Sequence, residues 1–174
     1  MSAGEPEAFA EIVAAEHDRA LRLAYLLAGD RDAAEDAVAE AFARTYEKWR
    51  AGKVGDVGPY VRRAVHNQVK NQRRAIARRR AHEQRRRGDD RGQARPTGQV
   101  AARDALLDLL ERLPHRQRAA IVLRYYEGCS EAETAEALGC RPGTVKSLTS
   151  RGTQALRQHA EAAGLDLADA GDAA

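Results

Sequence analysis

Basic, hydroxyl-bearing and small residues crowd together near residue 145 of the 174-residue chain, in a pattern that could bond bases and phosphates. A short helical pattern over residues 131–138 is followed by Gly139 and by a longer helical pattern that begins near Pro142. A short helix, a turn with glycine and a longer helix are typical of a helix-turn-helix, whose second helix enters the major groove by its N-terminal half. The alternative is an ordinary helical cluster with a solvated polar face, but the spacing favours DNA binding. The residues crowded into that half are Arg141, Pro142, Gly143, Thr144, Lys146, Ser147, Ser150 and Arg151.

A second polar group follows the helix predicted over residues 60–81, whose apolar stripe consists of Val61, Val65, Val69 and Ile76. Two asparagines among its basic side chains can bond base edges, while Arg and Lys suit phosphates. Either this face binds DNA or it is a solvated charged face. Its two polar rows are Arg62, His66, Lys70 and Arg73, and Arg63, Asn67, Asn71 and Arg74.

An acidic row lies on the helix predicted up to about Arg50, which starts with a capping-box-like pair, Asp32 and Glu35. No nucleophile, histidine partner or metal-ligand spacing accompanies these carboxylates, so we predict no catalytic residue, no metal site and no cofactor. The row is either a solvated face or a surface that docks a protein. It consists of Asp36, Glu40, Ala43 and Glu47.

The charge is distributed unevenly along the chain. The net charge is only +3, yet residues 62–87 hold eleven Lys or Arg and a single acid, Glu83. Two cysteines, Cys129 and Cys140, make neither a disulfide framework nor a zinc site. Because we find neither an apolar stretch that could span a bilayer nor a signal peptide, we expect a cytoplasmic protein without membrane insertion.

The pattern predicts an all-α fold of two small helical domains joined by a flexible linker. The first domain covers residues 5–81, and a Gly-, Pro- and Arg-rich linker covers 82–100. The second domain covers 101–160, and its first helix carries Ala102, Leu106, Leu109, Leu110 and Leu113 on its apolar stripe. The acidic tail, 161–174, is expected to be disordered at least in part.

Three segments resemble the extracytoplasmic-function (ECF) sigma factors of bacterial RNA polymerase, in particular a short actinobacterial subgroup. They are DRDAAEDAVAEAFARTYEKW over 30–49, PYVRRAVHNQVKNQRR over 59–74, and residues 113–157 with their LP, YYEG, SEAETA, LG and GTVKS elements. The sequence departs from the usual pattern in four places. Ala39 stands where Gln is usual, Ala37 where Leu is usual, Leu148 where a basic residue is common and Thr134 where Ile is common.

The resemblance implies a sigma factor without catalytic activity that directs core polymerase to promoters and helps to open the DNA. The first domain is then sigma region 2, which docks on the clamp coiled coil of the largest subunit through Asp36, Glu40, Ala43 and Glu47. Its third helix reads the −10 element, and a flipped base is held near residues 50–60. The second domain is region 4, which meets the polymerase flap and reads the −35 element with its last helix.

Two other functions remain open from the residues alone. One is a helix-turn-helix regulator that acts without polymerase, and the other is a scaffold or anti-sigma-like protein that binds only proteins. Two DNA-reading helices on separate domains favour the sigma factor, since a simple repressor does not need both. The resemblance adds an anti-sigma factor as a candidate partner. The terminal Ala173–Ala174 resembles tails read by the ClpXP protease, which makes these two residues a candidate degron.

Overall fold

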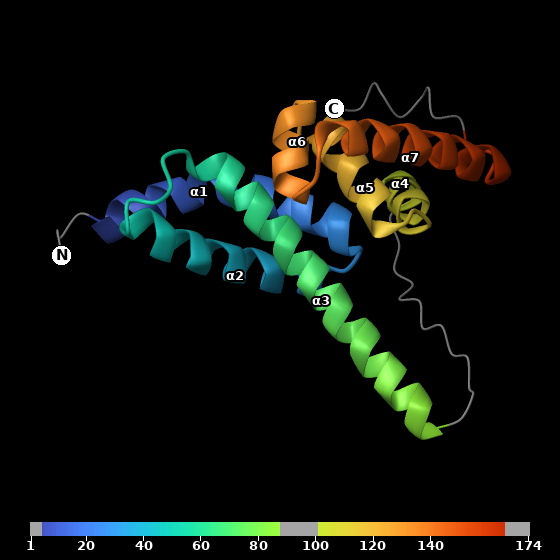
Figure 1. The fold of residues 1–174 in the computed structure, drawn as a ribbon, viewed down its shortest axis with the longest axis horizontal. Helices are drawn as coiled ribbons and strands as arrows, with labels where there is room; N and C mark the ends of the chain where they lie inside the picture. The colour runs from blue at the N-terminus through green and yellow to red at the C-terminus, as the bar shows by residue number, and fades with distance from the viewer. Residues whose placement is uncertain (1–4, 88–100, 166–174) are drawn as a thin grey trace.

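A computed structural model describes residues 5–87 and 101–165, and the regular structure within these ranges is entirely helical (Figure 1). The expected all-α class is confirmed. The N-terminal domain contains three helices, and the C-terminal domain contains four α-helices and one π-helical turn, η1. The elements are α1 (Glu5–Ala28), α2 (Arg31–Arg50), α3 (Val57–Arg87), α4 (Ala101–Glu111), α5 (His115–Ile121), η1 (Val122–Tyr126), α6 (Glu131–Leu138) and α7 (Pro142–Ala162).

The turn between α1 and α2 is set by two adjacent residues. Gly29 ends α1 with a φ of +80°, a conformation that side chains with a Cβ rarely adopt. Asp30 is the N-cap of α2, and its carboxylate accepts a hydrogen bond of 2.8 Å from the backbone N–H of Ala33. The predicted start at Asp32 and Glu35 was therefore wrong, because the N-cap lies two residues earlier, at Asp30. Asp32 instead lies in the first turn of α2, where its negative charge stabilises the helix by interacting with the positive end of the helix dipole.

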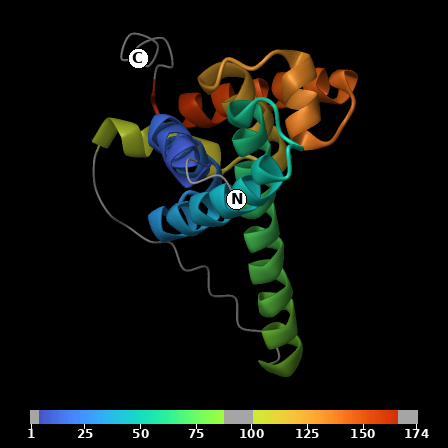
Figure 2. The same cartoon turned by 90° about the vertical axis from the view of Figure 1, so that its left-hand side faces the viewer.

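α3 is longer than predicted, because the expected linker residues 82–87 continue the helix to Arg87. Figures 1 and 2 show its C-terminal half projecting beyond the other helices. Val61, Val65 and Val69 are buried as expected, but Ile76 is 46% exposed because it lies on this projecting half. The rest of the predicted linker and residues 166–174, with Ala173 and Ala174, lie outside the described residues.

The apolar stripe predicted for α4 differs from the buried face at one position, Leu106. Leu107 is 7% exposed, whereas Leu106 is 39% exposed. Leu109, Leu110 and Leu113 are buried as expected, and Val145 of α7 is fully buried.

The two domains pack against each other. One cluster of buried side chains runs from α1, α2 and α3 into α5, η1 and α6. In both ribbon views α6 lies against the N-terminal part of α3 (Figures 1 and 2). Among the described helices, none combines the length and apolar composition that a membrane crossing requires.

Candidate nucleic-acid interface

α6, its turn and the start of α7 form the predicted helix-turn-helix. Ser130 and Glu133 make a capping box: the Ser130 Oγ accepts from the Glu133 N–H at 3.2 Å, and the Glu133 carboxylate accepts from the Ser130 N–H at 2.7 Å. These hydrogen bonds lower the pKa of Glu133. Gly139 ends α6 in the left-handed conformation, with a φ of +61°. The short helix and the start of α7 thus fall where the sequence placed them.

The N-terminal half of α7 packs against its domain with one side and exposes the other side to solvent. Val145 is fully buried and Leu148 is half-buried, so this side of the helix anchors it to the domain. Lys146 has a single weak ion pair, 4.0 Å from its Nζ to the Glu131 carboxylate. The opposite side presents the residues predicted to contact DNA: Arg141, Pro142, Gly143, Lys146, Ser147, Ser150 and Arg151 are exposed, and Thr144 is half-buried.

α3 carries the second polar face. Asp56 supports its first turn, since the Oδ1 atom accepts from the N–H of Gly58 at 3.1 Å. The Lys70 Nζ donates to the Asn67 Oδ1 at 3.3 Å, which fixes the orientation of that amide. Of the predicted residues on this face, Arg63, Asn71, Arg73 and Arg74 are exposed, and Arg62, Asn67 and Lys70 are half-buried.

His66 was predicted to lie on the exposed polar face of α3, but the structure buries it. It is only 2% exposed, and its imidazole lies close to the backbone of Ala137 in α6. Its ring also stacks on that of His115, with ring centroids 5.6 Å apart. His66 is buried because the C-terminal domain covers this side of α3.

Burial and nearby cations lower the pKa of both histidines. Loss of solvation, followed by the charges of His115 and Lys70, lowers the pKa of His66 to about 4. Loss of solvation, followed by the charges of Arg73 and Arg118, lowers the pKa of His115 to about 4. Both rings are consequently neutral near pH 7. They line a groove of about 1150 Å³ between the domains, together with Lys70, Arg73, Arg74, Arg116 and Arg118 and with the acids Asp30 and Glu111.

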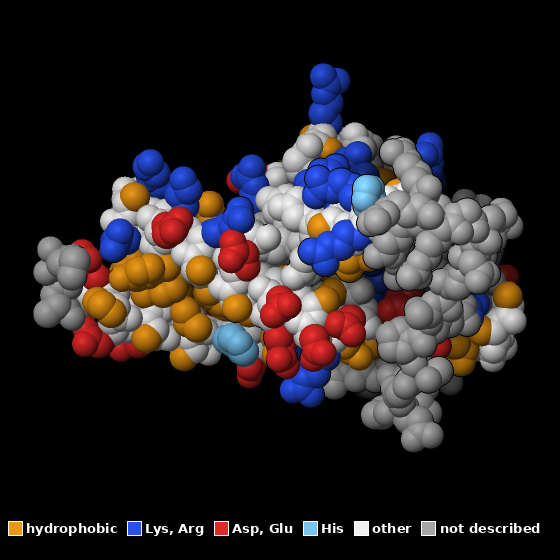
Figure 3. Space-filling view, turned by 90° about the horizontal axis from the view of Figure 1, so that it is seen from below, with side chains coloured by type: hydrophobic (Ala, Val, Ile, Leu, Met, Phe, Trp, Pro, Cys, Tyr) orange, Lys and Arg blue, Asp and Glu red, His pale blue; other side chains and the backbone are white. Residues whose placement is uncertain are grey.

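The predicted acidic row of α2 is exposed along its whole length. Asp36, Glu40, Ala43 and Glu47 all face solvent, and the Glu40 carboxylate accepts from the Arg44 Nε at 2.6 Å. Figure 3 shows acidic side chains gathered on one part of the surface and Lys and Arg gathered on another. The acidic row of α2 is thus an exposed surface separate from the basic face of α3.

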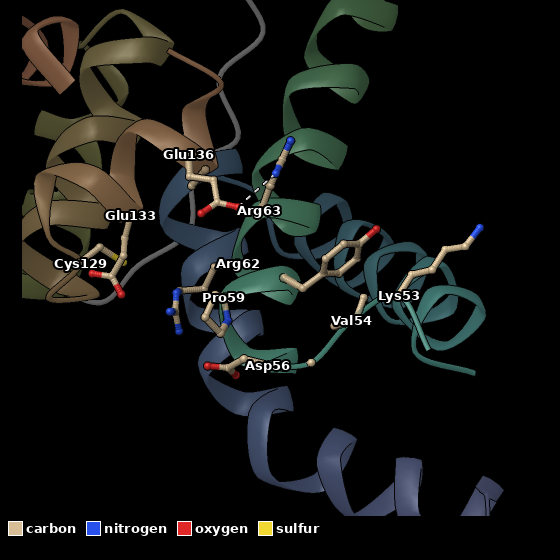
Figure 4. Close-up of a pocket in the computed structure, with 12 residues that line it drawn as sticks. Lys53, Val54, Asp56, Pro59, Arg62, Arg63, Cys129, Glu133 and Glu136 are labelled. Carbon is tan, nitrogen blue, oxygen red and sulfur yellow. Dashed lines mark hydrogen bonds and ion pairs between the residues drawn. The ribbon is translucent and has the colours of Figure 1, made fainter. Parts of the chain in front are cut away.

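Aromatic residues next to the loop before α3 have distinct roles in packing. Trp49 is half-buried and lies against Phe9, with ring centroids 5.4 Å apart, which fits core packing. Tyr60 is half-buried and lines a pocket of about 200 Å³ with Lys53, Val54 and Asp56 (Figure 4). This pocket also contacts α6, through Glu133 and Glu136.

The sequence analysis missed the polar residues that join the domains. Arg118 is 1% exposed and Glu127 is 7% exposed, both without a local motif that would set them apart from surface charges. Tyr125 and Tyr126 of the YYEG element are 68% and 49% exposed. They lie in η1, whose wider π-helical turn shifts the face that each residue presents.

Comparison with known proteins identifies the class of this two-domain helical protein. The Sigma-70 region 2 family matches residues 12–80, and the Sigma-70 region 4 family matches residues 103–156. RNA polymerase sigma-E factor of Streptomyces avermitilis is 36% identical over 169 residues, which cover 95% of this chain and 92% of that protein. ECF RNA polymerase sigma factor SigE of Mycolicibacterium smegmatis is 33% identical, over 86% of this chain and 60% of that protein.

Solved structures share the fold. The sigma factor RpoE of Bartonella quintana, in complex with the anti-sigma factor NepR, aligns with a TM-score of 0.70 and 23% identity, over 87% of this chain and 96% of that one. CnrH, in complex with the cytosolic domain of CnrY, aligns with a TM-score of 0.62 and 18% identity, over 90% of each chain. The chain belongs to the ECF sigma factors of bacterial RNA polymerase, which are initiation factors and not enzymes.

Proposed function

We propose that this ECF sigma factor divides promoter recognition between two helices on separate domains. α3 reads the −10 element with Arg62, Arg63, His66, Asn67, Lys70, Asn71, Arg73 and Arg74. α7 reads the −35 element with Arg141, Pro142, Thr144, Lys146, Ser147, Ser150 and Arg151. The observation that supports this division most directly is the open N-terminal half of α7 at the end of a capped helix-turn-helix.

Polymerase docking is assigned to the acidic face of α2. Asp36, Glu40 and Glu47 point away from the core and would meet a basic surface of the largest-subunit clamp. The C-terminal domain would contact the flap region of the polymerase. Since the acidic row lies on α2 and the proposed DNA contacts lie on α3 and α7, polymerase and DNA need not compete for the same surface.

An anti-sigma factor is proposed as a further partner. RpoE of Bartonella quintana is described in complex with the anti-sigma factor NepR. A protein of that kind would hold the present chain inactive by binding across its two domains. Affinity purification of the chain from its own cells, followed by reconstitution of the captured partner in transcription, would test the assignment.

Run-off transcription with core polymerase tests the main proposal. The chain should direct transcripts from a promoter selected from a random −10 and −35 library, and none should form without it. Failure to select any promoter in the presence of active core polymerase would sink the proposal. Loss of transcripts on replacing the α2 carboxylates, with DNA contacts unchanged, would support the docking face.

Single substitutions separate the two DNA contacts. Lys146→Ala should weaken binding to −35 duplex and lower the slope of log affinity against log salt by about one, because a phosphate contact is lost. Arg157→Ala, an exposed change beyond the proposed contact half of α7, is the matched control. Asn67→Ala should alter −10 preference more than overall affinity, and a uniform loss across sequences would refute that role.

A further inference from the structure

The groove between the domains is lined mainly by basic side chains. Its volume is about 1150 Å³, and five cations line it: Lys70, Arg73 and Arg74 of α3 and Arg116 and Arg118 of α5. Among the described residues only two carboxylates, one from the turn before α2 and one from α4, line the same groove. Cations that are held near one another repel unless an anion neutralises them, so this composition favours a negatively charged occupant.

The same groove holds most of the buried polar side-chain atoms that have no hydrogen-bond partner. Of seven such atoms among the described residues, five belong to residues that line the groove. Because buried polar atoms are nearly always hydrogen-bonded, their concentration here indicates a place that receives a polar ligand. They are the Nδ1 of His66, the Oε1 of Gln72, both ring nitrogens of His115 and the Nη2 of Arg118.

Arg118 is the most deeply buried of the five cations, at 1% exposed. Its Nε donates to the carbonyl of Leu26 in the last turn of α1, which holds the guanidinium in place. Loss of solvation, followed by the charge of Arg73, lowers the pKa of Arg118 to about 10. The Glu111 carboxylate favours the charge of Arg118, but the Nη2 of that guanidinium has no partner among the described residues. Such a cation gains more from a bound phosphate than a solvated surface cation does.

The groove has room for more than a single phosphate group. Small-molecule sites commonly enclose about 300–1,000 Å³, and this groove is slightly larger. Four of the five cations are arginines, whose planar guanidinium groups bind phosphate oxygens in pairs. Part of the lining is apolar, since Ile76 is 46% exposed and lies next to Ala77 on the same helix. Cations from two helices therefore suit a compound with two or more linked phosphates, and the apolar part leaves room for an organic group.

We propose that the groove binds a small molecule with two or more linked phosphates, held by Arg73 of α3 and by Arg116 and Arg118 of α5. Arg118 supplies its unpartnered Nη2, while Arg73 and Arg116 supply exposed guanidinium groups. The neutral rings of His66 and His115 donate N–H groups to the same anion. This site goes beyond promoter recognition, because Arg116 and Arg118 belong to neither set of proposed DNA contacts.

Isothermal titration calorimetry of the full-length chain with inorganic pyrophosphate tests the site. The native chain should bind pyrophosphate at a single site, and Arg116→Ala should weaken binding about tenfold, because a charged hydrogen-bond donor is lost. Arg112→Ala is the matched control, since Arg112 is exposed four residues earlier and does not line the groove. Absence of binding to the native chain, or an equal loss in both variants, would overturn the proposal.

A second pair of variants should change the affinity in the opposite direction. Glu111→Gln removes a carboxylate that repels phosphate in the groove, so pyrophosphate should bind several-fold more tightly. Asp108→Asn makes the same charge change at an exposed site on α4 outside the groove and should leave the affinity unchanged. If both variants bind pyrophosphate equally tightly, the anion responds only to net charge and the proposed site is wrong.

Other compounds identify the chemistry that the groove recognises. Orthophosphate should bind about tenfold more weakly than pyrophosphate, because one phosphate group cannot reach the cations of both helices at once. Citrate carries several charges without phosphate, and citrate binding as tight as that of pyrophosphate would overturn the assignment to phosphates. If ATP binds more tightly than inorganic triphosphate, the site is one for nucleotides, and equal affinities assign it to the phosphate chain alone. These titrations contain neither promoter DNA nor polymerase, so their failure would leave the proposed promoter recognition untouched.

Discussion

The imidazole rings of His66 and His115 stack almost parallel across the domain boundary, with centroids 5.6 Å apart and 3° between their planes. His66 belongs to α3 and His115 begins α5, so each ring completes the burial of the other. Neither has a carboxylate hydrogen bond among the described contacts, and the charged groups around them are mostly cations. The pair is therefore stable as two neutral rings and unstable as two imidazolium ions.

Acidification should lower the free energy of unfolding of the chain. Both pKa values are lowered from 6.5 to about 4, so the unfolded or separated state binds protons first as the pH falls. Stability is lost from about pH 6.5 down to about pH 4 and is fully present above that window. One pKa unit corresponds to about 1.4 kcal/mol, which gives at most about 2 kcal/mol per histidine between pH 7 and pH 5.

Urea unfolding at pH 7, 6 and 5 measures this loss. The groups facing the pair are Lys70, Arg73 and Arg74 of α3, Arg116 and Arg118 of α5, and the acids Glu111 and Asp30 in the same groove. A His66→Phe variant that still folds should lose about half of the pH dependence. Equal slopes for the native chain and His66→Phe would contradict the explanation.

Two glycines of α7 should respond in opposite directions to alanine. A Cβ on Gly152 would lie 2.7 Å from the Ile121 Cδ1 and 3.3 Å from the Gln117 Cβ, whereas a Cβ on Gly143 meets nothing within 4 Å. Gly152→Ala should cost about 1–3 kcal/mol through overpacking against α5. Gly143→Ala should gain up to about 1 kcal/mol from helix propensity.

Chemical denaturation of the two variants gives both signs in one experiment. Ile121→Val removes a methyl group close to Gly152, so the double variant with Gly152→Ala should recover part of the loss. If Gly152→Ala were as stable as the native chain, α5 and α7 would be packed less closely than the structure has them.

The start of α2 shows that the sequence predicts a helix end to within a few residues but does not identify its cap. The pattern placed the start of this helix at Asp32 and Glu35, although Asp30 also precedes the apolar helical repeat. The backbone conformation identifies Asp30 as the N-cap, because Asp30 is extended, with φ −134° and ψ 136°. Its carboxylate accepts a hydrogen bond from the N–H of Ala33. Asp30→Ala should cost about 1 kcal/mol, and Asp32→Ala only a few tenths, as measured by thermal unfolding. Equal losses would show that the two carboxylates share the cap.

Local patterns predicted the helices better than the contacts between them. Gly139 and Pro142 mark helix ends by short-range chemistry, and each of them lies at or next to the end it predicted. The Arg19–Glu127 pair joins residues 108 positions apart, and nothing near either residue distinguishes it from a surface charge. The burial of His66 has the same origin, since it depends on where the second domain packs. Such contacts emerge only once the whole chain is folded.

Thr134 provides a test of packing inside the helix-turn-helix. It is fully buried, and its hydroxyl oxygen has no hydrogen-bond partner among the described residues. Thr134→Val keeps the shape and removes a desolvated polar atom, so it should stabilise the chain by about 1 kcal/mol.

Thr45 of α2 is the matched control, because it is equally buried but donates to the carbonyl of Ala41 at 2.7 Å. Thr45→Val loses that hydrogen bond and should be neutral or destabilising by up to about 1 kcal/mol. Urea unfolding of both variants gives the difference directly. A destabilised Thr134→Val variant would mean that the hydroxyl has a partner in solution, such as a buried water, and that the polar residue at this position contributes to the stability of α6.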